Sequence, residues 1–378
     1  MIYLDNNATT QIAPAVFDAM QPYLLENYGN PSSAYAAGGD TRSAVESARE
    51  NVAELVGARL ASEIVFTSGG TESDNWAILG ALEATGKKHI VTTRVEHEAV
   101  RKLCQRLETR GYTVSWLDVD EEGLLDLDQL RDALTPETAV VSVMMANNET
   151  GVIFPVAEIA AVVREHSDAL FHVDGVNAVG KIAVDLASTK IDLFSLSAHK
   201  FHGPKGVGAL YIRDGVSLPS IAIGGGQESG RRAGTEAVHQ IVGLGAAVEF
   251  IKDIAPMEHV RELRDRLETE ILQRIPCTRL NGHPKHRLPN TSNISFENTN
   301  GEMILARLDA RGICVSTGSA CNAHDHTASA VLEAMNVPYS YSMGSIRFSL
   351  GRMNTTDEVN LVLSSITEIL PELRSLAA

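Results

Sequence analysis

One lysine lies between a histidine and a glycine-rich turn, directly after an apolar segment, in SLSAHKFHGPKGVG (195–208). A lone lysine in such a segment is usually a solvated loop residue, and this interpretation of Lys200 stays open when the segment is taken alone. The other interpretation is a nucleophilic amine at the carboxyl end of a parallel sheet, where open α/β folds bind their ligands. The choice depends on which other groups meet Lys200.

Two further segments offer groups that complement a reactive amine. SGGTES (68–73) follows a predicted strand and opens a helix, so its backbone forms either an anion cradle or a plain tight turn. HVDGVNAVGK (172–181) ends a predicted buried strand on Asp174, whose carboxylate either caps the backbone or meets a cation. A Schiff-base lysine, a carboxylate for a pyridinium nitrogen and a phosphate cradle are together the three parts of a pyridoxal phosphate site.

The elements that must position these groups follow from the hydrophobic pattern. Apolar runs of strand length alternate with helical patterns from residue 63 to about 213, as in parallel-sheet units. We therefore predict an α/β fold with a mostly parallel seven-stranded sheet covered by helices. The predicted strands are 63–67, 89–93, 113–119, 138–146, 170–174, 191–196 and 208–212.

A second region begins with a strongly amphipathic helix over 256–275. It continues with a strand at 291–296, a helix at 301–311, a strand at 345–350 and a closing helix from about 356. We therefore predict a large cofactor-binding domain over 15–255. Residues 1–14 and 256–378 are expected to form a smaller α+β domain.

Composition narrows the class of protein. The chain has 378 residues and a formal net charge of −16, which argues against a surface built to bind nucleic acid. The first residues, MIYLDNNATT, have no secretory pattern, and the chain has no 18-residue apolar stretch, so we predict a cytoplasmic location without membrane spanning. No GxxxxGK[ST], GxGxxG or HExxH spacing occurs where it would support an ATPase, a dinucleotide enzyme or a metal-dependent hydrolase.

The four cysteines form no CxxC pair and no plausible disulfide framework. Cys104 and Cys314 lie in apolar helical and strand patterns and are predicted to be core residues, whereas Cys277 follows a helix end without an evident role. Cys321 lies in a Gly/Ser/Asn-rich stretch, STGSACNAHDHTASAVL, which is typical of an exposed loop. Free cysteines are usually buried and inert, so this setting distinguishes Cys321 from the others.

Several ordered strings across nearly the whole chain resemble the NifS/IscS cysteine desulfurases, within the fold-type I pyridoxal phosphate enzymes of the class-V aminotransferase type. The strings that carry the resemblance are YLDNNATT, GNPSS, FTSGGTESDNWAI, VEHEAV, ANNETGVIFP, HVDGVNAVGK, SLSAHKFHGPKGVGALY, GRRAGTE and STGSAC.

The resemblance implies a role for each matching residue. Lys200 would carry the cofactor and move the substrate's Cα proton, Asp174 would keep the pyridine nitrogen protonated, and His97 would stack on the ring. Asn148 and Asn177 would contact the phenolic oxygen of the cofactor. Its phosphate would be bound by Gly70, Thr71, Ser197, His199 and Thr235, the last from a second subunit of an obligate homodimer.

The same resemblance implies the reaction. Arg347 matches the position that binds the substrate's α-carboxylate, which suits a planar guanidinium, and Asn7 would face the same substrate. L-cysteine would become L-alanine, with a persulfide left on Cys321. The sulfur would then pass to an iron–sulfur scaffold protein, or alternatively serve the modification of nucleic acids.

The chain departs from the family pattern at three places. Asn177 stands where the family commonly has glutamine, so its contact with the cofactor is expected to be longer or bridged by water. His324 and His326 follow Cys321 in place of the usual Pro-Ser-His run, and they either lower the cysteine pKa, bind a metal ion, or form a solvated polar loop. The short carboxyl end resembles the NifS branch.

Alternatives remain open from the sequence. A selenocysteine lyase or a small-amino-acid aminotransferase would use the same core, and product analysis separates them from a desulfurase. A catalytically idle sulfur-carrier or scaffold-binding subunit could retain the fold, although the presence of Lys200 and Cys321 argues against it.

Overall fold

The computed structural model describes residues 1–317 and 328–377. Its largest sheet has the strand order β2-β8-β7-β6-β5-β3-β4. Neighbouring strands are parallel except at β8, which is antiparallel to both β2 and β7, so the prediction of a mostly parallel seven-stranded sheet is confirmed. The strands are β2 (Ile64–Thr67), β3 (His89–Thr93), β4 (Thr113–Leu117), β5 (Thr138–Met144), β6 (Leu170–Asp174), β7 (Leu193–Ser197) and β8 (Gly208–Ile212).

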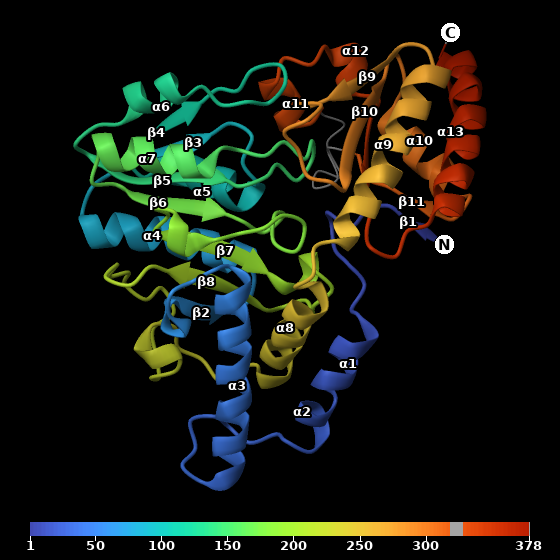
Figure 1. The fold of residues 1–378 in the computed structure, drawn as a ribbon. Coiled ribbons are helices and arrows are strands. Elements are labelled where there is room, and N and C mark those ends of the chain that lie inside the picture. The colour runs from blue at the N-terminus through green and yellow to red at the C-terminus, as the bar shows by residue number, and fades with distance from the viewer. Residues whose placement is uncertain (318–327, 378) are drawn as a thin grey trace.

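Helices cover both faces of this sheet, which explains why its inner strands are apolar on both sides (Figure 1). Side chains of α4 (Gly70–Thr85) and α5 (Glu98–Glu108) share one apolar cluster with β3 and β5. Side chains of α6 (Leu127–Ala133) and α7 (Val156–His166) belong to a different, larger cluster. The alternation of strand and helix patterns in the sequence therefore corresponds to a three-layer arrangement.

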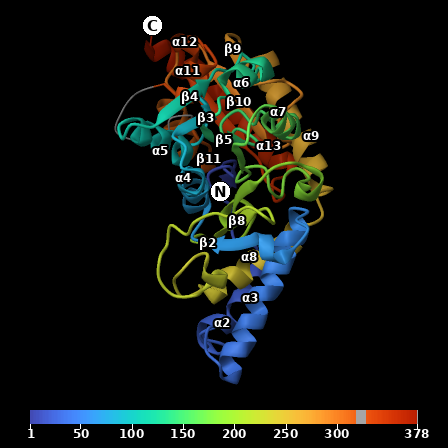
Figure 2. The ribbon, with the colours of Figure 1, turned by 90° about the vertical axis from the view of Figure 1, so that its left-hand side faces the viewer.

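Four helices extend away from one edge of the sheet (Figures 1 and 2). The long α3 (Ala36–Leu55) packs against α8 (Val238–Ile251), and α8 also contacts α1 (Pro14–Met20) and the short α2 (Pro22–Leu25). A Cβ on Gly245 would lie 2.8 Å from the Cβ of Ala48, so the absence of a side chain at Gly245 lets α3 and α8 approach closely.

The carboxyl-terminal third forms a second apolar core around a three-stranded antiparallel sheet of order β12-β10-β9. The amino terminus returns to this region, because β1 pairs in parallel with β11 and Leu4 is buried in the same core. The boundary near residue 255 stays a prediction. The elements of this region are β1 (Ile2–Tyr3), α9 (Pro256–Arg274), β9 (Thr278–Asn281), β10 (Thr291–Phe296), α10 (Gly301–Asp309), β11 (Ile313–Cys314), α11 (Ala330–Ala334), α12 (Tyr339–Ser342), β12 (Ser345–Ser349) and α13 (Thr356–Ala377).

Short 3₁₀ helices η1 (Ala61–Glu63), η2 (Leu186–Ser188), η3 (Ala198–Lys200) and η4 (Glu228–Gly230) connect the larger elements. Cys104 is fully buried as expected, but the core placement predicted for Cys314 is wrong, because this residue on the two-residue strand β11 is only half-buried. Across the described part of the chain, none of the helices combines the length and apolar character that crossing a membrane requires.

Candidate functional site

A cavity of about 730 Å³ lies at the carboxyl ends of the sheet strands, where ligands bind in open α/β folds. Cys321 lies outside the described residues, as do His324 and His326. Thr235 is exposed and is not among the described residues that line the cavity. The structure brings the other predicted site residues together around this space: Asn7, Gly70, Thr71, His97, Asn148, Asp174, Asn177, Ser197, His199, Lys200 and Arg347.

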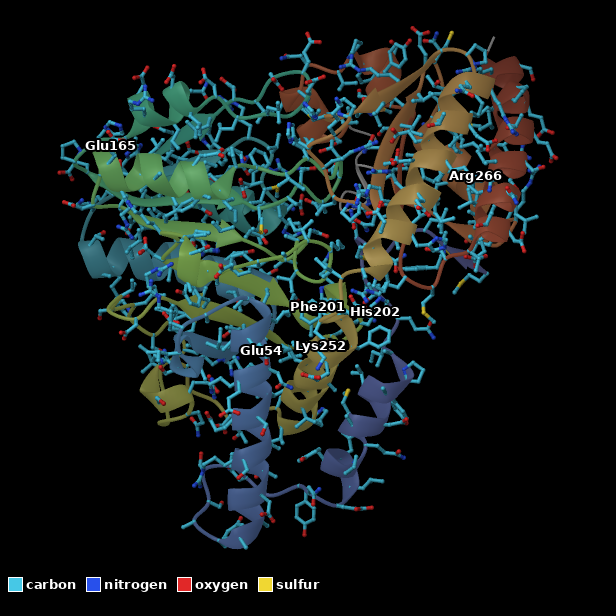
Figure 3. All side chains as sticks on the ribbon, viewed as in Figure 1. Glu54, Glu165, Phe201, His202, Lys252 and Arg266 are labelled. Atoms are coloured by element: carbon cyan, nitrogen blue, oxygen red, sulfur yellow. The ribbon has the colours of Figure 1, made fainter. Side chains whose placement is uncertain are left out.

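Lys200 ends η3, directly after β7. Its Nζ donates to the carbonyl oxygens of Asn7 at 2.5 Å and Ala8 at 3.1 Å. Figure 3 shows that the next two residues, Phe201 and His202, lie beside each other near the end of α8. The His202 N–H donates to Thr10 Oγ1 at 2.6 Å, so the amino-terminal segment holds both the amine and the turn that follows it.

Asp174 ends β6 with its side chain buried in the cavity wall. One carboxyl oxygen, Oδ1, accepts from the Val176 N–H at 2.9 Å, which is the capping contact that sequence reasoning left open. Burial raises the pKa of Asp174, while the nearby His97 and Lys200 act in the opposite direction. A bound cation would therefore be favourable beside this carboxyl.

Two carboxyls that the sequence analysis missed line the same cavity, namely Asp74 on α4 and Glu96 before α5. Burial raises the pKa of Glu96 to about 8, and burial next to Asp174 raises the pKa of Asp74 well above its usual range. Asp74 Oδ1 and Glu96 Oε2 are buried without a hydrogen-bond partner among the described residues, and the nearest cation-forming group to Asp74 Oδ1, His172 Nε2 at 3.5 Å, is kept neutral because burial lowers its pKa to about 3. We call Asp74, Glu96 and Asp174 the acidic group.

His97 is the N-cap of α5, because its Nδ1 accepts from the Ala99 N–H at 3.2 Å. Its ring also lines the cavity, so the helix-capping role and the predicted ring-stacking role are compatible. Burial lowers the pKa of His97, which outweighs the opposite influence of the Asp174 carboxyl, and Lys200 contributes in the lowering direction. The imidazole is therefore favoured in its neutral form, which suits contact with a flat, cationic ring.

The amino end of α4 forms a second hollow of about 370 Å³ beside the main cavity. Gly70 opens the helix there, and a Cβ on it would lie 2.7 Å from Val176 Cγ2. A helix amino end with glycine backbone is suited to an anion. Predicted phosphate contacts Gly70, Thr71, Ser197 and His199 all line this hollow, together with Lys205, which the sequence analysis did not select.

Arg347 on β12 is 6% exposed, so it is not the surface strand arginine that was the alternative. Its Nη2 lies 2.7 Å from Asp5 Oδ1, and its Nη1 donates to the carbonyl of Asn148 at 3.0 Å. The third donor, Nε, is buried and has no partner among the described residues. The guanidinium is thus fixed in place, and these two contacts leave further N–H donors of its five for a carboxylate.

Asn7 lines the cavity, but its amide is engaged by protein groups. Its Nδ2 donates to the Asn148 carbonyl at 3.1 Å and to Thr291 Oγ1 at 2.9 Å. Its Oδ1 accepts from Asn290 at 3.0 Å and from the buried amine of Lys181 at 2.9 Å. Asn7 is therefore held between the amines of Lys181, which donates to its side chain, and Lys200, which donates to its backbone carbonyl.

The residues that sequence reasoning missed lie next to those that it found. Asp74 is one helical turn after Gly70, and Glu96 directly precedes His97, so chemistry-bearing neighbours in the same motifs were the available signal. Glu149 follows Asn148, and Ser329 donates to its carboxyl at 2.5 Å. Burial raises the pKa of Glu149 to about 7.

The comparisons with known proteins agree with this geometry. Residues 2–362 match the model of the aminotransferase class-V family. The chain is 52% identical over 380 residues to a cysteine desulfurase of Nostoc sp., covering 100% of this chain and 94% of the relative. A solved NifS-like protein matches with a TM-score of 0.93 at 39% identity, over 98% of this chain and 100% of that one. The solved structure of SspA in complex with cysteine matches with a TM-score of 0.83 at 35% identity, over 94% of this chain and 100% of that chain.

Proposed function

This chain belongs to the class-V aminotransferase family of pyridoxal phosphate-dependent enzymes, and from that premise we propose that it is a cysteine desulfurase. It converts L-cysteine to L-alanine and transfers the sulfur to a thiol of its own. The persulfide sulfur then supplies iron–sulfur cluster assembly through a scaffold protein. The cytoplasmic location stays a prediction from the sequence.

The observation that carries the proposal is the convergence of Lys200, Asp174 and Arg347 on one cavity. Lys200 on η3 offers an amine, Asp174 on β6 offers a carboxyl in need of a cation, and Arg347 on β12 offers a guanidinium with unused donors. Together they match the needs of a cationic ring and of an amino acid carboxylate. The hollow at Gly70 adds a place for a phosphate.

The residues present fit pyridoxal phosphate. Asp174 would hold the protonated ring nitrogen, His97 would lie against the ring, and Asn148 and Asn177 would meet the phenolic oxygen. Ser197, His199 and the start of α4 would hold the phosphate. When bound, the cofactor withdraws the electrons left on the substrate Cα after its proton has gone, which requires a protonated ring nitrogen.

Two side chains of this protein act on the substrate directly. Arg347, which lines the cavity, binds the α-carboxylate through N–H donors that the protein leaves unused, and its contact with Asp5 fixes the plane of the guanidinium. Lys200 Nζ takes the proton from the substrate Cα and holds it at the reaction centre. The carbonyls of Asn7 and Ala8 set the direction of that amine.

Cys321 accepts the sulfur in this proposal. Its thiolate attacks the substrate sulfur, so an S–S bond forms while the C–S bond to the substrate Cβ breaks. The electron pair of the broken bond remains on the carbon side, and protonation there completes alanine; one cysteine and one thiol thus give one alanine and one persulfide. Thr317 and Ala328, the described residues on either side of 318–327, both line the cavity.

We also propose that the enzyme acts as a homodimer in which Thr235 completes the phosphate site of the partner subunit. Thr235 is exposed in its own chain, which leaves it accessible for such a contact. Large apolar side chains are exposed on the same chain at Leu25, Tyr28 and Ile223. Exposed apolar surface of this kind is typical of a protein–protein interface.

The test follows both products of the reaction. Purified protein is given L-cysteine and a reductant, and sulfide and alanine are measured together for wild type, Lys200→Ala and Cys321→Ser. We expect equal amounts of both products from wild type, a fall of at least roughly 10³-fold in Lys200→Ala, and loss of sulfide in Cys321→Ser. A keto acid in place of alanine, or undiminished sulfide release by Cys321→Ser, would contradict the proposal.

A further inference from the structure

Lys181 is a buried amine that the proposed reaction does not use. It lies in the turn that follows β6, directly after Gly180, which has a positive φ of 78°. The residue is only 7% exposed. A buried lysine is costly, so its contacts should reveal what it does.

Its Nζ donates to two amide oxygens, Asn7 Oδ1 at 2.9 Å and Asn177 Oδ1 at 3.3 Å. Within residues 1–317 and 328–377, none of the ion pairs involves Lys181. Burial lowers the pKa of Lys181 well below its usual range, and the nearby Lys200 and Arg347 act in the same direction. An uncharged amine donating to neutral amide oxygens fits these surroundings.

Lys181 and Asn177 occupy different positions relative to the cavity. Of the described residues, those that line the main cavity include Asn177 but not Lys181. Lys181 instead lines a small neighbouring cavity of about 20 Å³, together with Lys200 and His202. The side chain of Asn177 thus lies between Lys181 and the space where a cofactor would bind.

An amide side chain has an acceptor end and a donor end, and neighbouring groups decide which way it turns. Because the Asn177 Oδ1 is occupied by Lys181, the Nδ2 end remains for the cavity. The phenolic oxygen of the cofactor is an acceptor and requires such a donor. The opposite orientation would place two oxygens against each other.

We propose that Lys181 is a positioning residue that holds Asn177 with its amide N–H directed at the phenolic oxygen of the cofactor. It does so from behind the cavity wall, where it also binds Asn7, whose carbonyl holds Lys200. The inference rests on the proposed function, because it assumes that the cofactor binds in this cavity. The contact with Lys181 also fixes the direction of the Asn177 side chain, which is one methylene shorter than the glutamine common at this position in the family.

The test is a double-mutant cycle with Lys181→Met, Asn177→Ala and the double variant, which shows whether Lys181 acts through Asn177. Methionine keeps the length and apolar stem of lysine but has no N–H donor. The matched control is Lys190→Met, which changes an exposed lysine near the same segment. Three quantities are measured: the dissociation constant of pyridoxal phosphate, the pH midpoint of its visible absorbance when bound, and the thermal midpoint of the cofactor-free protein.

In Lys181→Met we expect roughly 3- to 10-fold weaker cofactor binding and an upward shift of the absorbance midpoint by about 0.5 to 1 pH unit. Both changes have the size expected when one hydrogen bond to the deprotonated phenolic oxygen is lost. Asn177→Ala should show a similar shift, and Lys181→Met should add little in that background. The thermal midpoint should stay equal or rise, because a buried amine has been removed.

The outcomes separate three explanations. An equal further shift in the Asn177→Ala background would overturn the inference, since Lys181 would then act on the cofactor directly. Unchanged binding with a lower thermal midpoint would also overturn it, because Lys181 would be merely structural. If wild type binds no pyridoxal phosphate, the proposed function itself fails, whereas normal binding by wild type and Lys181→Met alike refutes only the positioning role.

Discussion

The two sets of charged groups around the cavity are supported by the protein in opposite ways. The acidic group, Asp74, Glu96 and Asp174, is buried with two carboxyl oxygens lacking hydrogen-bond partners among the described residues. The cationic side chains Lys200 and Arg347 are instead held by backbone carbonyls and by Asp5. The cationic side is therefore fixed before any ligand binds, whereas the acidic side still requires protons or a cation.

This difference indicates how the site selects its ligand. Burial disfavours the charged form of a carboxyl, so it raises the pKa of all three members of the acidic group even though Asp174 and Glu96 each accept hydrogen bonds. A ring with a protonated nitrogen would supply one cation to three carboxyls, so at most one carboxyl needs to be ionised. Asp174, which already receives the Val176 N–H and lies near His97 and Lys200, is the member best suited to that charge.

The largest loss of activity is expected for Asp174→Asn, which removes one ionisable carboxyl from the acidic group while keeping the shape of the side chain. We expect kcat to fall roughly 10²- to 10³-fold, the size of breaking one buried charge pair. Steady-state desulfuration and the cofactor dissociation constant measure this. Asp168→Asn, at an exposed carboxyl just before β6, is the matched control, and activity within a factor of two of wild type in Asp174→Asn would refute the assignment.

Arg347→Gln tests the cationic side. Loss of the charged donor to the substrate carboxylate should raise the KM for L-cysteine roughly 10- to 100-fold, the range of a charged hydrogen bond, with a smaller change in kcat. Initial-rate kinetics separate the two constants, and Arg307→Gln, on the exposed side of α10, serves as the control. A fall in kcat at unchanged KM would mean that Arg347 supports the cavity rather than binding substrate.

The last prediction concerns stability, not activity, and the carboxyl of Glu96. Its pKa is about 8 in the folded protein against about 4.5 in the unfolded chain, so the folded state binds more protons between these values. The stability that Glu96 contributes is therefore complete below pH 4.5 and is lost progressively as pH rises to about 8. Glu96→Gln should flatten the pH dependence of the unfolding free energy in this window, by up to about 1.4 kcal/mol per pH unit.

Denaturant unfolding of the cofactor-free protein at several pH values measures this slope. Glu83→Gln, at an exposed position of α4, should leave the slope unchanged. In Glu96→Gln, the carbonyl oxygen of the new amide can still accept from Thr93 and from the Met144 N–H, as the carboxyl does. A variant destabilised equally at every pH would therefore show that packing, and not protonation, dominates at Glu96.

Strands with both faces buried were the most predictable part of the fold. Three strand predictions of the large sheet, 89–93, 170–174 and 208–212, agree with the structure at both ends. Such strands are continuous apolar runs ended by polar or glycine residues, and a short sequence contains that signal. The direction of β8 was not contained in it, because an apolar run is the same in a parallel and an antiparallel neighbour.

The residues of the candidate site likewise fall into those that the sequence indicated and those that only the structure revealed. The sequence alone pointed to Lys200 and Asp174 through the strand ends on which they lie, and to His97 and Arg347 through the resemblance to a known family. Only the tertiary structure decided that Asp74 and Glu96 converge on Asp174, and that Lys181 lies behind Asn177. Burial and unused hydrogen bonds arise from elements far apart in the chain, and their cost exists only once those elements have excluded water from the groups between them.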